Sequence, residues 1–189
     1  KKKQAKHALM QEMNLTPNDD PLLGIVSRFD PQKGLDLVTQ LLPRCAEQGI
    51  RLCVLGSGTD ELETAFRQLA ADYPEHLGLK LGFDNGLAHR IFAGTDMMLI
   101  PSRFEPCGLT QLYAMRYGNV PIASAVGGLK DTIEEVKLSD GVYDSGSGYL
   151  FDPLTADMFW AAIERATDLY QSKPEQWRQL AKTIMAKDF

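Results

Sequence analysis

The chain has 189 residues, 44% of them hydrophobic and 24% charged, with a formal net charge of −5 at pH 7. This length and composition are typical of one globular domain with its own core, and the negative charge argues against nucleic acid as a main partner. No apolar run approaches the ~20 residues that span a bilayer, and no apolar segment follows the basic start, so we expect neither a membrane span nor a signal peptide.

Short apolar runs alternate along the chain with segments that have apolar residues on one helical face. The runs predict buried strands, at residues 22–29, 50–55, 77–83, 97–100, 120–126 and 149–151. The amphipathic segments predict helices, at residues 1–13, 34–48, 60–73, 87–93, 109–117, 129–136, 155–170 and 174–187. Residues 138–148 are polar and rich in Gly and Ser, which predicts a surface loop. The alternation predicts an α/β fold with a doubly wound, mostly parallel, Rossmann-like six-stranded sheet over residues 1–189.

The loop that joins the strand at 97–100 to the next helix is the most informative stretch. It carries Glu105, and in an open α/β sheet ligands bind at the carboxyl ends of the strands. The free backbone N–H groups of Gly108, Leu109 and Thr110 would point at an anion at the start of the helix. We therefore interpret this loop as a place where Glu105 holds sugar hydroxyls while the amides hold a phosphate.

A second stretch, at residues 27–34, lies at the carboxyl end of the first strand and carries Arg28 and Lys33. Arg presents a fork and Lys a point charge, and both can bind a pyrophosphate. Spacing alone leaves open the alternative of a surface Arg and of a Lys that merely starts a helix.

The stretch Gly56-Ser57-Gly58 begins like the dinucleotide fingerprint G-x-G-x-x-G, but Glu61 stands in place of the third glycine. An NAD-dependent dehydrogenase is therefore a weak alternative. A glycine-rich turn with Asp60 as the N-cap of the next helix explains these residues better. Gly56 can still lie close to a nucleotide.

Gly82 and Phe83 end the third predicted strand, ahead of Leu87 in the short helix that follows. An aromatic ring at a strand end can stack on a nucleobase. The alternative is a Phe83 ring that simply packs in the core.

Cysteine and histidine residues are not placed for metal binding or for nucleophilic catalysis. The chain contains no Asp-x-Asp pattern, and its histidines are scattered, so we expect no metal site and no cofactor. Cys107 has no His nearby in the sequence to activate it as a nucleophile. The cysteines are odd in number and widely spaced, which predicts reduced thiols in a cytosol-like compartment; they are Cys45, Cys53 and Cys107.

Three sequence elements resemble those of bacterial glycogen synthases and plant starch synthases, which are retaining glycosyltransferases of family 5 with the two-domain GT-B fold. The longest is R-F-E-P-C-G-L-T-Q-L-Y at residues 103–113. The others are S-R-x-x-x-Q-K-G at residues 27–34 and G-G-L-x-D-T at residues 127–132. The resemblance covers essentially the whole chain. We expect the last element to form a turn packed beside the central loop rather than to act in catalysis.

The resemblance implies that the chain binds the donor in an enzyme that transfers glucose from ADP-glucose to the non-reducing end of an α-1,4-glucan. The implied catalytic residues are Arg28 and Lys33, which would hold the diphosphate, and Glu105, which would orient the glucose. Phe83 would contact the base, and Cys107 would line the glucose pocket. The full set of implied substrate-binding residues is Gly82, Phe83, Leu87, Glu105, Cys107, Gly108, Leu109 and Thr110. No metal is implied.

The amino-terminal domain of this family, with its K-x-G-G-L loop and most of the acceptor groove, has no counterpart in the sequence. We therefore expect this chain alone to bind ADP but not to catalyse transfer, and we expect the glucan to contact mainly the absent domain. The implied location is the bacterial cytoplasm, or the plastid stroma in a plant or alga.

Tyr113 marks a departure from the wider GT-B superfamily, in which many members carry a second glutamate at this position. The tyrosine favours the glycogen and starch synthases over UDP-sugar transferases, and it leaves the ribose contact of that glutamate unassigned. A UDP-sugar transferase and a non-catalytic nucleotide-binding or regulatory module stay open as alternatives.

Overall fold

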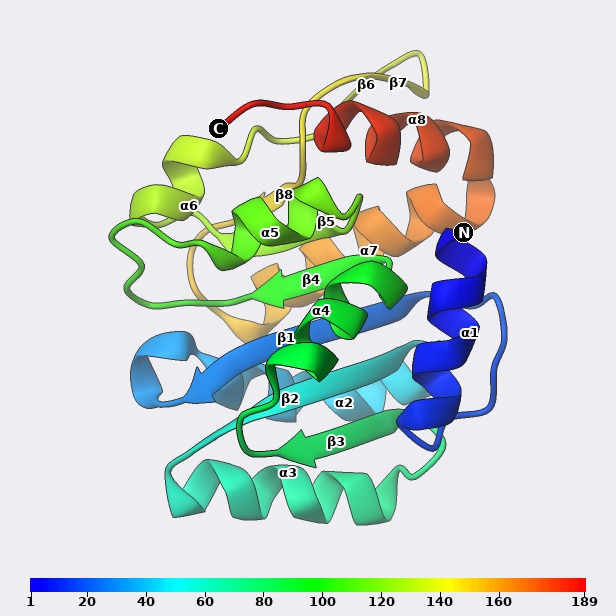
Figure 1. Cartoon of the computed structure of the whole chain (residues 1–189). Coiled ribbons are helices and arrows are strands. Elements are labelled where there is room, and N and C mark those ends of the chain that lie inside the picture. The colour runs from blue at the N-terminus through cyan, green and yellow to red at the C-terminus, as the bar shows by residue number, and fades with distance from the viewer.

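The computed structural model describes all residues 1–189, and its centre is a six-stranded sheet (Figure 1). The strands are β1 (Leu22–Phe29), β2 (Arg51–Gly58), β3 (Leu77–Leu81), β4 (Met97–Ile100), β5 (Val120–Ser124) and β8 (Tyr149–Phe151). They lie in the order β3-β2-β1-β4-β5-β8, and every neighbouring pair is parallel. The predicted doubly wound α/β fold is therefore confirmed.

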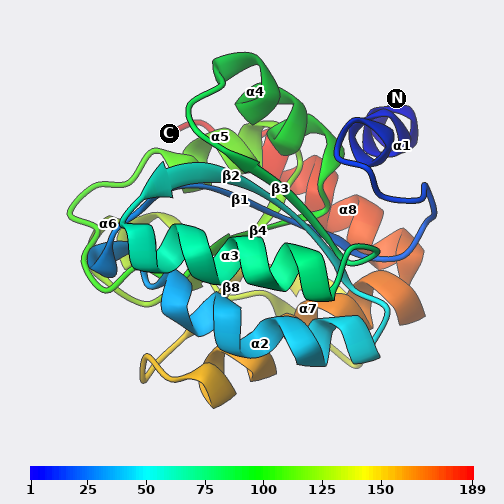
Figure 2. The ribbon, with the colours of Figure 1, turned by 90° about the horizontal axis from the view of Figure 1, so that it is seen from below.

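Helices cover both faces of this sheet. Figure 2 shows α2, α3 and α7 on one side of the strands, with α1 and α4 on the other. The helices are α1 (Lys2–Glu12), α2 (Leu35–Glu47), α3 (Asp60–Asp72), α4 (Asn85–Gly94), α5 (Thr110–Arg116), α6 (Gly127–Thr132), α7 (Ala156–Ser172) and α8 (Pro174–Met185), with a 3-10 turn η1 (Pro31–Lys33). No helix has both the length and the apolar character that crossing a bilayer requires.

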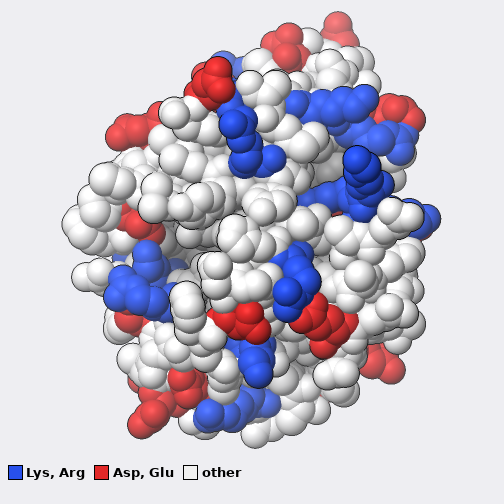
Figure 3. Space-filling model, viewed as in Figure 1, with Lys and Arg blue, Asp and Glu red and all other residues white.

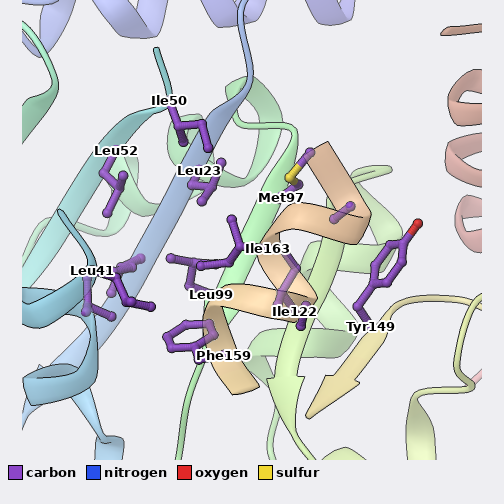
Figure 4. Packing of buried hydrophobic residues seen from close by; sticks show 14 of the residues in the cluster. Leu23, Leu41, Ile50, Leu52, Met97, Leu99, Ile122, Tyr149, Phe159 and Ile163 are labelled. Carbon is purple, nitrogen blue, oxygen red and sulfur yellow. The ribbon is translucent and has the colours of Figure 1, made fainter. Parts of the chain in front are cut away.

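Two apolar clusters fill the space on the two faces of the sheet. The larger joins α2, α3, α7 and α8 to the strands, and Figure 4 shows Phe159 from α7 beside Leu99 of the sheet. The smaller joins α1, α4 and α6 to the opposite face, which includes Leu22. Successive strand residues point to opposite faces, so strands buried on both faces are apolar at nearly every position. This is why the apolar runs predict the strands well.

The structure differs from the predicted elements mainly at their ends. The cap of α3 is Thr59, whose side chain accepts a hydrogen bond from the Leu62 N–H, and not Asp60 as expected. The predicted loop at 138–148 contains an antiparallel hairpin, β6 (Lys137–Ser139) and β7 (Val142–Ser145). Nearly all of its residues are exposed, so no alternation of apolar and polar residues marks these strands in the sequence.

Charged side chains of both signs are spread over the face seen in Figure 3, and several Lys and Arg side chains lie close together at its upper right.

A buried ion pair fastens α1 to the amino-terminal edge of the sheet. Lys6 Nζ lies 2.7 Å from Asp96 Oδ2, and the two side chains are only 4% and 7% exposed. The ammonium also donates to Asp20 O and to Tyr170 Oη, while Asp96 Oδ2 accepts from the Leu22 N–H at 2.9 Å. Burial acts to lower the pKa of Lys6, but the charge and hydrogen bond of Asp96 outweigh burial and raise that pKa. Lys6 therefore stays charged at neutral pH.

We predict that Lys6→Met lowers the free energy of unfolding by about 3–5 kcal/mol, because it leaves the Asp96 carboxylate buried without a counter-ion. Lys3→Met is the matched control, since Lys3 lies on the same helix but pairs with Asp19 in solvent, where an ion pair contributes little. Denaturant unfolding of both variants checks this. Equal stability of the two variants would contradict the role given to the buried pair.

Candidate functional site

A hollow of about 330 Å³ opens at the carboxyl ends of the first four strands. Here β1 and β4 are neighbours, and the strand order reverses between them, which is where ligands bind in open α/β sheets. Residues from both predicted loops line the hollow, together with the end of β3. The expected site residues found there are Arg28, Lys33, Gly82, Phe83, Glu105 and Thr110.

Lys33 and Glu105 form an ion pair inside this hollow. Lys33 Nζ lies 2.8 Å from Glu105 Oε2, and the two side chains are 21% and 16% exposed. Ser102 Oγ donates to the same carboxylate oxygen at 3.2 Å. Lys33 comes from η1 after β1, and Glu105 comes from the loop after β4. The pair therefore presents a cation and a carboxylate side by side to any ligand that enters.

Arg28 lies near the end of β1, and its side chain lines the hollow while remaining largely in solvent. Its guanidinium is 3.2 Å from the Asp30 carboxylate. An exposed pair of this kind is weak, so the guanidinium can turn toward an anion at small cost. The two cations that the sequence suggests for a pyrophosphate, Arg28 and Lys33, thus face one hollow.

The glycines at the end of β2 are explained by close strand packing. A Cβ atom at Gly56 would lie 1.9 Å from Ser27 O, and one at Gly58 would lie 2.2 Å from Phe29 O. The contact between β1 and β2 therefore accounts for both glycines without a dinucleotide fingerprint. Gly56 also lines the hollow, in agreement with the expectation that it lies near the ligand site.

Phe83 stands at the rim of the hollow with 93% of its surface exposed. The alternative of a core aromatic is therefore wrong. Asp84 follows it and caps α4 by accepting a hydrogen bond from the Leu87 N–H at 2.8 Å. The Leu87 side chain packs in the smaller apolar cluster and does not line the hollow, because it lies on the inward face of the amphipathic helix. The expected contact between Leu87 and a substrate thus has no support from its position.

The segment after Glu105 lies beside the hollow rather than within it. Cys107 and Leu109 are exposed and do not line it, and neither does Gly108, whose φ is +74°. Only Thr110, the first residue of α5, reaches the hollow. The backbone N–H groups of residues 108–110 donate to no other backbone group of the chain. No backbone acceptor of the chain therefore competes for these N–H groups.

The Gly-Gly pair at the start of α6 packs against the loop that carries Glu105. The Gly128 N–H donates to Glu105 O at 2.8 Å, and a Cβ atom at Gly128 would lie 1.8 Å from Cys107 O. The predicted packing of this element beside the central loop is confirmed. It supports the loop from the side opposite to Lys33.

Ser102 and Asp84 also line the hollow, although neither is predicted from the sequence to be a site residue. Gln111 is a third residue without a predicted role. Its side-chain amide donates to Cys107 O at 3.2 Å and to Gly108 O at 3.1 Å. Ser102 and Asp84 are polar residues just after a strand, and that position could have marked them. The buried Gln111 lies in a helix that is otherwise read as apolar on its inner face, and nothing in the pattern marks it.

We predict that Gly128→Ala lowers the free energy of unfolding by about 1–3 kcal/mol, because the added methyl group overlaps the backbone at Cys107. Gly86→Ala is the matched control, since Gly86 is likewise the second residue of a helix but its Cβ would meet only the flexible end of Arg90 and the Asp84 carboxylate. Denaturant unfolding measures both. A Gly128→Ala variant as stable as the control would show that the contact with the loop is not tight.

The comparison with known proteins agrees with this geometry. The family described as glycosyl transferases group 1 matches residues 8–184. The chain is 44% identical over 182 residues to a glycogen synthase of Serratia proteamaculans, and 45% identical over 184 residues to one of Cellvibrio japonicus. These stretches make up 96% and 97% of this chain but 38% of each relative, so the chain spans well under half the length of these relatives.

A solved structure gives the same result for the fold. The catalytic domain of starch synthase IV from Arabidopsis thaliana, bound to ADP and acarbose, is 36% identical and superposes with a TM-score of 0.91 over 100% of this chain and 39% of that one. The family match, the identity to glycogen synthases and the shared fold lead to one conclusion. The chain belongs to the glycosyl transferases group 1 family.

Proposed function

We propose that this chain is the donor-binding domain of a retaining glucosyltransferase that moves glucose from ADP-glucose to the non-reducing end of an α-1,4-glucan. The observation that carries the proposal is the Lys33–Glu105 pair at the switch point of the sheet. A sugar nucleotide needs a cation for its diphosphate and a polar group for its sugar, next to each other. The glycogen synthase names of the relatives and the ADP bound to starch synthase IV indicate which sugar nucleotide this is.

In this proposal the donor enters with its diphosphate toward Arg28 and Lys33, and its base toward the exposed ring of Phe83. The glucose then lies toward Glu105, which gives up Lys33 and accepts hydrogen bonds from sugar hydroxyls. The Lys33–Glu105 ion pair is thus replaced by contacts of Lys33 with the diphosphate and of Glu105 with the sugar. The free amides of residues 108–110 assist in holding the phosphates.

The bond between the anomeric carbon and the diphosphate breaks as the acceptor 4-OH attacks that carbon. Positive charge develops on the sugar ring and negative charge on the departing diphosphate, which Arg28 and Lys33 stabilise. The diphosphate takes the proton of the attacking hydroxyl. Apart from Glu105, the carboxylate that lines the hollow is Asp84, and it is engaged as the cap of α4. We therefore assign no carboxylate as a covalent nucleophile.

In the proposal Arg28 and Lys33 neutralise the negative charge of the diphosphate, and no metal or cofactor is required. It assigns the glucan acceptor mainly to a second domain outside these 189 residues, since the chain spans 38% of its glycogen synthase relatives. This chain alone should then bind ADP and fail to elongate glucan. The enzyme would act where ADP-glucose is made, in the bacterial cytoplasm or in a plastid stroma.

We predict that Arg28→Ala and Lys33→Ala each weaken ADP binding to the chain roughly ten- to hundredfold, since each removes a charge-assisted contact worth about 1.5–3 kcal/mol. Lys33→Ala also leaves Glu105 unpaired and facing the diphosphate. Calorimetric titration gives the affinities. Arg67→Ala is the control, because Arg67 is an exposed arginine on α3 that pairs with Glu63 and does not line the hollow. Wild-type ADP affinity in both folded site variants would rule out the phosphate assignment.

We predict that Glu105→Gln lowers turnover about 100-fold or more while ADP binds as well as before or more tightly. The lost charge matters most when positive charge develops on the sugar, and ADP carries no sugar at that position. ADP also no longer competes with a carboxylate for Lys33. Turnover is measured in a chimera of this chain with the amino-terminal part of the Serratia glycogen synthase. A large loss of ADP affinity with turnover unchanged at saturating donor would instead place Glu105 on the nucleotide.

A further inference from the structure

Lys33 and Glu105, the ion pair in the hollow, lie 72 positions apart in the chain. The side chain of Arg103 links the two segments that carry them. Arg103 donates from its two terminal guanidinium nitrogens, Nη1 and Nη2, to the two carboxylate oxygens of Asp36, at 2.7 Å each. The same guanidinium donates to Pro31 O at 2.9 Å, and the Arg103 backbone N–H donates to Gln32 O at 2.8 Å. Along the chain, Arg103 lies between Ser102 and Glu105, and its partners lie on both sides of Lys33.

These contacts are made where the two loops already touch. A Cβ atom at Gly34 would lie 1.9 Å from Pro101 O, so the backbones meet with no space for a side chain. On its other flank the Glu105 loop is held by Ser124, whose hydroxyl donates to Ser102 O at 2.5 Å, and by Gly128. The loop is therefore held toward β5 and α6 by Ser124 and Gly128. On the side toward Lys33, the backbone contact of Pro101 with Gly34 is supplemented by Arg103.

We propose that Arg103, through its bidentate pair with Asp36, is a positioning residue that sets the distance between Lys33 and Glu105 in the donor site. This inference rests on the proposed function, because it assigns Arg103 to the geometry of that same reaction. A displacement of about 1 Å at a reacting centre can cost roughly 100-fold in rate. The bidentate pair of Arg103 with Asp36 holds the two segments together and so fixes the positions of Lys33 and Glu105 to that accuracy.

Burial indicates that Arg103 acts on geometry more than on stability. The Arg103 and Asp36 side chains are 41% and 48% exposed, and pairs in that environment contribute little to folding. The hydrogen bonds from Arg103 lower the pKa of Asp36, so the pair stays ionised at the pH values at which an enzyme of this kind works. The pair does not line the hollow, which separates it from residues that touch the donor.

The chain offers a closely matched control. Arg90 and Glu12 also form a bidentate pair, with distances of 2.8 and 2.7 Å and similar exposure. That pair joins α4 to α1 and does not line the hollow. A change common to Arg103→Gln and Arg90→Gln therefore reports the loss of a surface pair, and a change confined to Arg103→Gln reports positioning.

The first test needs no donor and uses crystal structures of the chain itself. In Arg103→Gln and Asp36→Asn we expect the Lys33 Nζ to Glu105 Oε2 contact, 2.8 Å in the parent, to open beyond the ~4 Å of an ion pair. In Arg90→Gln we expect it to persist. If the contact persists in both Arg103→Gln and Asp36→Asn, the inference is wrong, whatever the enzyme does.

The second test uses the chimera with the Serratia amino-terminal part. We expect Arg103→Gln to lower kcat roughly 10- to 100-fold, with ADP affinity changed less than about threefold and with a Tm like that of Arg90→Gln. Arg103→Lys should not restore kcat, because an ammonium cannot form the fork. The double variant Arg103→Gln/Asp36→Asn should be no slower than the slower single variant, since the two residues act as one unit.

Three results would overturn the inference. One is a fall in kcat no larger than that of Arg90→Gln, and another is additive losses in the double variant. The third is ADP affinity that falls in step with kcat, which would place Arg103 on the nucleotide itself. If the unaltered chimera bound no ADP, the proposed function would fail. The crystallographic test would still decide whether Arg103 sets the distance between Lys33 and Glu105.

Discussion

The candidate site depends on the contact between the loop after β1 and the loop after β4. The strand order reverses between these two strands, so their loops leave the sheet side by side before the chain turns to opposite faces. Gly34, with a φ of +69°, lets its backbone touch Pro101 O without the overlap that a side chain would cause. This contact brings Lys33 and Glu105 close enough to form the ion pair in the hollow, and the other features of the site are arranged around that pair.

The Lys33–Glu105 pair explains how one small hollow can hold two unlike ligand groups. Each residue satisfies the other when no ligand is present, so neither charge is left alone in a partly buried position. Burying an unpaired charge is costly, and the mutual pairing avoids that cost. A ligand with an anionic part and a hydroxylated part can replace the pair in one step, whereas a simple anion would leave the glutamate without its partner. Under the proposed function, the pair would thus favour a sugar nucleotide over a free phosphate.

The strands were well predicted from the sequence because the parallel sheet buries both of their faces. The strands β1, β4 and β8 begin and end at the predicted residues, and each is a short apolar run next to Gly, Pro or polar residues. The β6–β7 hairpin was missed because its exposed strands carry no such pattern. The Lys6–Asp96 pair was missed as well, since a lysine on an amphipathic helix is normally assigned to the solvent face.

The site was predicted as far as the position of each residue along a strand or loop could define it. Arg28 lies near the end of β1, while Lys33, Phe83 and Glu105 follow strands that end at the same edge. All four residues line the hollow. Contacts between separate segments are a different matter, because they join residues that are far apart in the chain. Arg103, in the loop after β4, pairs with Asp36 near the start of α2, and no spacing within either segment indicates this pairing.

Calorimetric titration of this chain with ADP, UDP and NAD tests the central claim most directly. Under the proposed function we expect ADP to bind at one site and UDP to bind more weakly, because the similar starch synthase IV structure holds ADP. We expect NAD not to bind, because the stretch Gly56-Ser57-Gly58 lacks the third glycine of a dinucleotide fingerprint. The ADP affinity should fall in Lys33→Ala. Binding of NAD in the absence of any binding of ADP would contradict the account and would support a dinucleotide-dependent enzyme instead.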